Sequence, residues 1–350
     1  MMERSPTDSV SSSPGLLPLA FGQFTVTLVP EAPLALPPYP GGMFRGAFGL
    51  ALQRVVCVTR TLDCPPCWLK DRCMFPYVFD TPPPSNTEIM RKYNAAPHPF
   101  VLTPPFPGES VLLAGSSLRV GITLFGKALQ YLPYFVFAFE RLGQMGLGRH
   151  RVRCRLATVE ASFQDGAPAL LYSSEDRALR APDPFERAFR LELSAPPPSS
   201  EPSKEERLTI EFLTPARVVY QERLARTLDF HVLVRSLMRR IGHLSYFHCG
   251  GDVSGVAFRE WIERAEQVRV ISESLRWYDW ERFSGRQQAR MTLGGLLGRL
   301  TFQGNIAPFL PLLRVGEVTH VGKGTSFGLG QYQIVQGEGA SLHSQSGAGT

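Results

Sequence analysis

The 350-residue sequence has no run of apolar residues long enough to span a lipid bilayer. Its first residues, Met1 to Gly15, are rich in Ser and include acidic residues, so they do not resemble a secretory signal. Both absences predict a cytoplasmic protein with no membrane partner. Thiols stay reduced in that compartment, so the six cysteines are expected to be metal ligands or core residues and not disulfides.

Charged residues are also scarce. They make up 19% of the chain, whereas hydrophobic residues make up 43%, which is typical of a globular protein with well-filled cores. There are 37 Lys and Arg against 31 Asp and Glu, a net charge of +6. This small excess permits a polyanionic partner without requiring one, so the position of the basic residues has to decide.

Composition divides the chain into two domains. Residues 1–15 and 336–350 are polar, Gly/Ser-rich tails that are predicted to be disordered. The Pro/Ser-rich segment 196–206 is predicted to be a linker. It separates an N-terminal domain of residues 16–195 from a C-terminal domain of residues 207–335.

Both halves contain a helix, a glycine-rich loop and a closing strand in the same order. In the first half these are residues 129–144, 143–148 and 149–159, and in the second half residues 309–313, 322–330 and 332–335. This repetition indicates duplication of a small α+β unit, for which a ferredoxin-like (RRM-like) domain is the simplest candidate. The predicted fold is therefore α+β, with two tandem ferredoxin-like domains.

The clearest predicted helix covers residues 229–247 and ends at Gly250. Its apolar residues fall on one face: Phe230, Leu233, Val234, Leu237, Ile241 and Leu244. The opposite face carries a basic stripe of residues four apart: His231, Arg235, Arg239 and His243. Such a stripe could contact a nucleic-acid backbone. His248 falls on the apolar side, where a core or helix-capping role is expected.

The segment 322–330 has four glycines in nine residues. Glycine lets the backbone approach a ligand closely, Lys323 adds a charge for phosphate, and Phe327 offers a stacking face. The candidate RNA-binding residues of this loop are Gly322, Lys323, Gly324, Thr325, Phe327, Gly328 and Gly330. A tight structural turn would need the same glycines, so both interpretations stay open. The Gly-Lys-Ser/Thr order of a nucleotide-binding P-loop is absent.

A second group of candidates precedes this loop. Arg282 and Arg286 are four residues apart and could contact phosphates and base edges. Three aromatic residues lie next to them: Trp277, Tyr278 and Trp280. These aromatics could stack on bases or belong to a hydrophobic cluster.

The N-terminal domain contains a Cys-rich insertion, residues 57–73. Its four cysteines are Cys57, Cys64, Cys67 and Cys73. Four thiolates suit a structural zinc ion, which is the preferred interpretation, and an iron–sulfur cluster is the alternative. A third possibility is that Cys57 belongs to the core. A redox protein centred on these cysteines is the weakest of the functional hypotheses.

Several segments resemble those of CRISPR-associated RAMP proteins. The loop 322–330, with the preceding residues 309–320, looks like the C-terminal glycine-rich signature of that superfamily. Residues 40–49 resemble the turn and helix that open RAMP folds. The segments that resemble the precursor-CRISPR-RNA endoribonucleases in particular are residues 212–217, 230–235, 280–288, 294–298 and 302–304.

The resemblance implies a RAMP architecture in which two ferredoxin-like domains bind CRISPR repeat RNA. It also implies cleavage without a catalytic cofactor. The ribose 2′-hydroxyl attacks the adjacent phosphate, leaving a 2′,3′-cyclic phosphate and a 5′-hydroxyl. Such chemistry needs a base, an acid and a cation near the phosphate. Other CRISPR effector subunits are further expected partners.

The catalytic residues cannot be carried over directly, because residues 43–54 lack the histidine that many family members have on the first helix. Tyr39 is the candidate catalytic residue there and Arg45 a candidate RNA ligand. His231 is the first choice for the base, since the helix dipole and Arg235 favour its neutral form. A plain surface histidine is the alternative, and His320 is the second choice. A non-catalytic RAMP subunit that binds RNA as a scaffold therefore remains open beside the endoribonuclease.

Overall fold

The computed structural model describes residues 15–83, 87, 89, 95–106, 110–162, 167–180, 187–196, 206–284 and 289–335. The predicted tails fall outside these residues except for Gly15, and so does the predicted linker except for Pro196 and Glu206. None of the helices in these ranges is both long and apolar enough to cross a membrane.

The N-terminal half contains β1 (Leu16–Pro30), β2 (Leu34–Leu36), α1 (Gly41–Val56), α2 (Met74–Phe79), β3 (Phe100–Thr103), β4 (Ser110–Leu112), β5 (Leu118–Phe125), η1 (Gly126–Tyr131), α3 (Leu132–Met145), β6 (Cys154–Ser162), β7 (Ala169–Ser173) and β8 (Arg187–Glu192). The C-terminal half contains β9 (Glu206–Ala216), β10 (Val219–Tyr220), β11 (Arg223–Leu224), α4 (Phe230–Cys249), α5 (Phe258–Ala265), β12 (Arg269–Ser284), β13 (Ala289–Gly304), η2 (Ala307–Phe309), α6 (Leu310–Thr319), η3 (Thr325–Phe327) and β14 (Tyr332–Val335).

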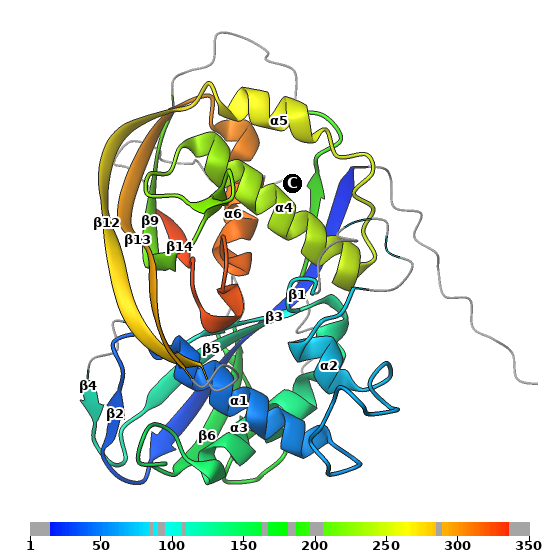
Figure 1. Cartoon of the computed structure of the whole chain (residues 1–350), viewed down its shortest axis with the longest axis vertical. Helices are drawn as coiled ribbons and strands as arrows, with labels where there is room; N and C mark the ends of the chain where they lie inside the picture. Colours follow the sequence, from blue (N-terminus) through cyan, green and yellow to red (C-terminus); the bar gives the residue numbers. More distant parts are fainter. Residues whose placement is uncertain are drawn as a thin grey trace, which may run out of the picture.

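Both halves have the same topology (Figure 1). The first follows β1-α1-β3-β5-α3-β6 and orders its sheet β3-β5-β1-β6, with β7 added at one edge and β8 on β1. The second follows β9-α4-β12-β13-α6-β14 and orders its sheet β12-β13-β9-β14. Each is a βαββαβ unit whose strands pair antiparallel in the ferredoxin-like order. The predicted pair of tandem ferredoxin-like domains is confirmed.

Strand β1 contributes to both cores. Leu17, Leu19 and Phe21 belong to the core of the C-terminal domain, whereas Phe24 and Val26 belong to that of the N-terminal domain. Successive side chains of a strand point to opposite faces, so the change from odd to even positions means that the two cores contact opposite faces of β1. Helix α4 packs on the first half of β1, where the Ser245 hydroxyl donates a 2.6 Å hydrogen bond to the Pro18 carbonyl.

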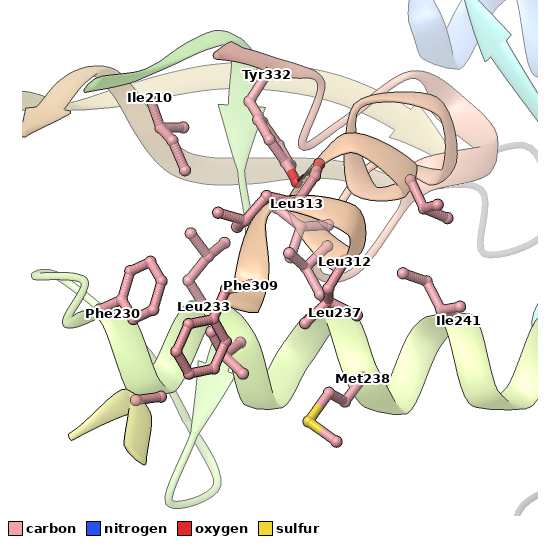
Figure 2. Packing of buried hydrophobic residues seen from close by; sticks show 14 of the residues in the cluster. Ile210, Phe230, Leu233, Leu237, Met238, Ile241, Phe309, Leu312, Leu313 and Tyr332 are labelled. Carbon is pink, nitrogen blue, oxygen red and sulfur yellow. Dashed lines mark hydrogen bonds between the residues drawn. The ribbon is translucent and has the colours of Figure 1, made fainter. Parts of the chain in front are cut away.

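Helix α4 is buried on more than one side. Figure 2 shows Leu233, Leu237 and Ile241 pointing toward α6, and Met238 pointing the other way. Burying a side chain of this kind stabilises the fold by roughly 1.5–3 kcal/mol. The six predicted apolar positions of α4 are all buried, and Gly250 ends the helix in a left-handed conformation with a φ of 73°.

The expected basic stripe on α4 is not an open surface. Arg239 is exposed, but His231, Arg235 and His243 are half-buried. The Arg235 guanidinium lies over the Phe258 ring of α5, 5.7 Å from its centroid, and its Nε is buried without a hydrogen-bond partner. The sequence could not show this, because a helical pattern does not reveal that a second sheet and α5 pack around the same helix.

The buried His248 makes stability depend on pH. Its Nε2–H donates to the Pro97 carbonyl at 2.8 Å and its Nδ1 accepts from Tyr77 at 3.0 Å, so the neutral ring has both nitrogens bonded. Burial lowers the pKa of His248 to about 4, whereas an exposed imidazole titrates near about 6.5. The stabilisation from His248 is complete above the pKa of this residue in the unfolded state, and it is lost as the pH falls toward the pKa in the folded state.

We expect lowering the pH from 7 to 5 to destabilise the protein by about 2 kcal/mol through His248 alone. Urea unfolding at the two pH values measures this. The His248→Gln variant has no titrating group at this position, so its stability should fall less over the same range. An equal fall in both proteins would contradict the assignment.

Candidate functional site

The glycine-rich loop 322–330 connects α6 to β14 and packs against the N-terminal domain. The Tyr39 hydroxyl donates to the Phe327 carbonyl at 2.9 Å, and Arg45 Nε donates to the Ser326 hydroxyl at 3.1 Å. Tyr39 lies just before α1, and Arg45 is in its first turns. We call this contact between the loop and the start of α1 the junction. The positive end of the α1 dipole therefore lies beside the loop.

The glycines of the loop are required by its own packing. A Cβ on Gly328, whose φ is +88°, would lie 2.6 Å from the Leu102 carbonyl oxygen. One on Gly330, whose φ is +72°, would lie 1.9 Å from the Val321 oxygen. The N–H groups of Lys323, Gly328 and Gly330 already donate to backbone carbonyls. The structural-turn interpretation thus explains Gly328 and Gly330, and RNA contact by Gly322, Gly324 and Thr325 stays a prediction.

Arg45 is held between the two domains. Its guanidinium lies between the Phe79 and Phe327 rings, 4.9 and 4.6 Å from their centroids. Besides the bond to Ser326, its Nη2 donates to His98 Nε2 at 3.0 Å. One cation therefore joins Ser326 of the loop to His98 of the N-terminal domain. Its guanidinium is placed to meet a negative charge at the junction.

His98 is a histidine at the junction that the sequence did not reveal. Because Arg45 can only donate, Nε2 of the ring is the acceptor, and Nδ1–H donates to the Thr81 hydroxyl at 2.8 Å. Burial, followed by the charge of Arg45, lowers the pKa of His98 to about 3. The ring is therefore neutral at pH 7, and its basic nitrogen faces Arg45. The only sequence signal is the pair of flanking prolines, Pro97 and Pro99, which favour an extended backbone.

Tyr39 is buried in an aromatic cluster. Its ring lies 5.1 Å from that of Trp280 and 5.5 Å from that of Phe106. Burial raises the pKa of Tyr39 well above its usual range, and its hydroxyl hydrogen is used on Phe327. The hydrophobic-cluster interpretation is confirmed for Trp280, which is 5% exposed. A catalytic role for Tyr39 would require this cluster to open.

Of the two histidines predicted from the sequence, His320 is buried beside the loop and His231 lies away from it. His320 is 3% exposed, its Nδ1 is 3.3 Å from the Leu329 carbonyl oxygen, and burial lowers its pKa to about 3. The His231 ring packs against Tyr220 of β10, with centroids 5.7 Å apart. Figure 1 shows that α4 begins in the upper part of the C-terminal domain, whereas the loop lies beside the N-terminal domain. Their catalytic roles stay predictions that this geometry does not favour.

Other cations lie around the loop. Lys323 is exposed, and the half-buried Arg217 donates from Nη1 to the Gly294 carbonyl at 2.5 Å. The fully buried Arg240 donates from Nε to the Thr319 carbonyl at 2.6 Å, and burial lowers its pKa to about 9. Arg286 and the side chain of Arg282 lie outside the described residues. Lys323, which the sequence predicted as an RNA-binding residue of the loop, is thus exposed to solvent.

The four cysteines of the insertion gather around one pocket. Within the described residues, however, no three Cys, His, Asp or Glu side chains are close enough together to hold a single metal ion. The structure therefore gives no support to the preferred prediction of a single zinc ion, since tetrahedral zinc draws its four ligands to within about 2.3 Å of one centre.

Each half of the chain matches a model of a known protein family. Residues 17–184 match a family model described as an N-terminal domain, and residues 210–332 match the model of the CRISPR-associated endoribonuclease Cas6. An Archaeoglobus fulgidus relative described as an uncharacterized protein is 26% identical over 308 residues, which are 85% of this chain and 92% of the relative.

Solved structures share the fold. A Cas6 product complex has a TM-score of 0.51 and 19% identity, covering 90% of this chain and 100% of its own. Thermus thermophilus Cas6 has a TM-score of 0.50 and 18% identity, covering 92% of this chain and 100% of its own. A partial Cas6-RT-Cas1–Cas2 complex has a TM-score of 0.54 and 14% identity, and covers 93% of this chain and 47% of its own.

Two ferredoxin-like domains with a glycine-rich loop before the last strand are thus the fold that this chain shares with the solved Cas6 structures. The match to the Cas6 endoribonuclease model covers residues 210–332, which form the C-terminal domain.

Proposed function

We propose that the protein is an endoribonuclease that cleaves precursor CRISPR RNA within its repeats. The reaction forms a bond between the ribose 2′-oxygen and phosphorus, breaks the bond from phosphorus to the 5′-oxygen, and overall moves the proton of the 2′-hydroxyl to that 5′-oxygen. The products are a 2′,3′-cyclic phosphate and a 5′-hydroxyl. The match of residues 210–332 to the Cas6 family supports RNA processing as the activity.

The observation that carries the proposal is the link from Arg45 to both Ser326 and His98. It joins a fixed cation, a hydroxyl and a neutral imidazole where the glycine-rich loop contacts the start of α1. A guanidinium placed in this way can stabilise the charge that develops on the phosphate oxygens. The neutral imidazole provides a base for the 2′-hydroxyl.

Binding of the phosphate would change both groups together. If the guanidinium turns toward the phosphate, Nε2 of His98 loses its donor and gains a free lone pair. The negative phosphate also offsets the charge of Arg45, which is one of the causes of the lowered pKa of His98. His98 therefore becomes a stronger base when the substrate is bound. Its hydrogen bond to Thr81 already holds the tautomer in which Nε2 carries the lone pair.

A non-catalytic RAMP scaffold is the second candidate function. Two of the catalytic candidates taken from the sequence are buried and hydrogen-bonded, namely Tyr39 and His320. In addition, α1 carries no histidine. A protein of this kind would bind repeat RNA and leave it intact.

Incubation of the purified protein with end-labelled repeat RNA in EDTA distinguishes the two functions. We expect cleavage at one position and a product that ends in a 2′,3′-cyclic phosphate. A matched RNA with a 2′-deoxyribose at that position should stay intact, because the attacking hydroxyl is missing. Tight binding without cleavage of either RNA would establish the scaffold instead.

Lys323→Ala is expected to weaken RNA binding at all sequences equally, because the side chain is an exposed cation with no role in reading bases. The slope of log Kd against log salt concentration should decrease by the amount that corresponds to the loss of about one phosphate contact. Titrations at several salt concentrations measure it. The Lys127→Ala variant, which removes a cation from η1 instead, is the control. An unchanged slope for Lys323→Ala would remove this residue from the RNA surface.

A further inference from the structure

The segment between α1 and α2 carries four cysteines that the proposed RNA chemistry does not use. Cys57 follows the last residue of α1, and Cys73 immediately precedes α2. Cys64 and Cys67 come from the connecting loop. All four line one pocket, whose other walls are mainly apolar and include Val56, Leu69, Phe75 and Pro76. Chain segments separated by a loop thus bring four soft ligands to one place.

The described part of the chain shows no ligand group arranged for a single ion. Around tetrahedral zinc, four sulfurs at about 2.3 Å from the metal lie within about 4 Å of one another. The described residues contain no group of three ligands that is compact enough for one ion. In a [4Fe–4S] cluster each of four thiolates binds a different iron, so the sulfurs surround the cluster at larger separations. Four cysteines around a shared pocket fit that arrangement.

Hydrogen-bonding groups lie beside two of the four sulfurs, those of Cys57 and Cys64. Gln53 Nε2 donates to Cys64 Sγ at 3.2 Å, and the Thr59 hydroxyl lies 3.4 Å from Cys57 Sγ. The backbone N–H of Leu62 also bonds to the Cys57 thiol. Arg60 and Leu62 have φ values of 59° and 57°, a conformation that non-glycine residues seldom adopt. The loop therefore turns its backbone donors around Cys57, and hydrogen bonds to sulfur stabilise cluster thiolates.

We propose that Cys57, Cys64, Cys67 and Cys73 bind a [4Fe–4S] cluster, one thiolate to each iron. The four thiols release their protons when they bind. The cluster crosslinks the end of α1 to the start of α2 and takes the place of hydrophobic packing in a loop that contains few buried residues. This site is independent of the RNA chemistry proposed above.

The cluster also has a structural consequence for the junction. Phe79 of α2 packs so closely on α1 that a Cβ on Gly49 would lie 2.6 Å from its ring, and the same ring lies against Arg45. Loss of the cluster should loosen α2 and thereby the position of Arg45. This effect on cleavage rests on the proposed function, whereas cluster binding does not.

Metal and sulfide analysis of the full chain, purified without oxygen, tests the proposal. We expect about four iron and about four sulfide per chain, with a brown colour that dithionite bleaches. About one zinc and no iron would overturn the cluster in favour of a single ion. About two iron and two sulfide would overturn the [4Fe–4S] assignment. A chain that holds neither metal, even after incubation with iron and sulfide, would show that the pocket binds no cluster.

Variants connect the cluster to its ligands. Cys64→Ala with Cys67→Ala should lose the iron, the sulfide and the colour, and should melt at a lower temperature than the parent. Cys249→Ala removes a cysteine that lies outside the pocket and should keep all three properties. Iron retained by the double variant would overturn the assignment of the ligands. If the double variant does not fold, the metal content of the unchanged protein still decides the proposal.

Discussion

Replacing His98 by alanine is expected to lower the rate of repeat-RNA cleavage by about 10²–10⁴-fold, the usual contribution of a positioned general base. The affinity for RNA should change little, because the largely buried ring carries no charge at pH 7. Single-turnover cleavage and a separate binding titration with 2′-deoxy RNA measure the two effects. The combination of lost cleavage and retained binding distinguishes a base from a residue that only supports the fold.

Two further variants make this result specific. His150→Ala removes an exposed histidine from the turn after α3 and should cleave at the parent rate. His231→Ala tests the base that the sequence favoured. If His231→Ala abolishes cleavage while His98→Ala does not, the assignment made from the sequence is right and the one made from the junction is wrong.

Replacing Arg45 by alanine is expected to lower cleavage by about 10²–10³-fold, since this guanidinium is the cation proposed to stabilise the phosphorane. Removing it also leaves His98 Nε2 without its donor. The pKa of His98 should then rise from about 3, because the charge of Arg45 helps to lower it. NMR titration of the histidine side chains detects that rise independently of any cleavage assay.

Two control variants accompany Arg45→Ala: one removes another arginine of α1, and the other keeps the positive charge at position 45. Arg54→Ala removes an exposed arginine from the last turn of α1 and should leave cleavage unchanged. Arg45→Lys keeps the charge but loses the planar fork that reaches Ser326 and His98 together, so it should restore only part of the activity. Full activity in Arg45→Ala would exclude this residue from the reaction.

The sequence predicted the fold well because the fold depends on local patterns repeated in both halves. The strand at 332–335 and the apolar face of α4 follow from local sequence patterns alone. The burial of the basic stripe on α4 did not follow. It depends on α5, whose Phe258 lies under Arg235, and on β10, whose Tyr220 packs against His231, and no periodic pattern within α4 reveals these contacts.

The site was predicted only in part, for the same reason. Residues 322–330 and Arg45 were both selected from the sequence, because the resemblance to RAMP proteins covers both segments, and the structure brings them into contact. His98 was missed, since 53 residues separate it from Arg45 and no periodic pattern connects them. The sequence left RNA contact and a structural turn open for the glycines, and the close approach of the loop backbone to Leu102 and Val321 explains Gly328 and Gly330 as turn residues.

The most direct test of the proposed active site is a crystal structure of the protein bound to repeat RNA with a 2′-deoxyribose at the cleavage position. We expect the scissile phosphate to lie at the junction, within hydrogen-bond distance of the Arg45 guanidinium, with His98 Nε2 facing the position of the missing 2′-hydroxyl. A scissile phosphate bound beside His231, or anywhere else away from the contact of α1 with the glycine-rich loop, would contradict it.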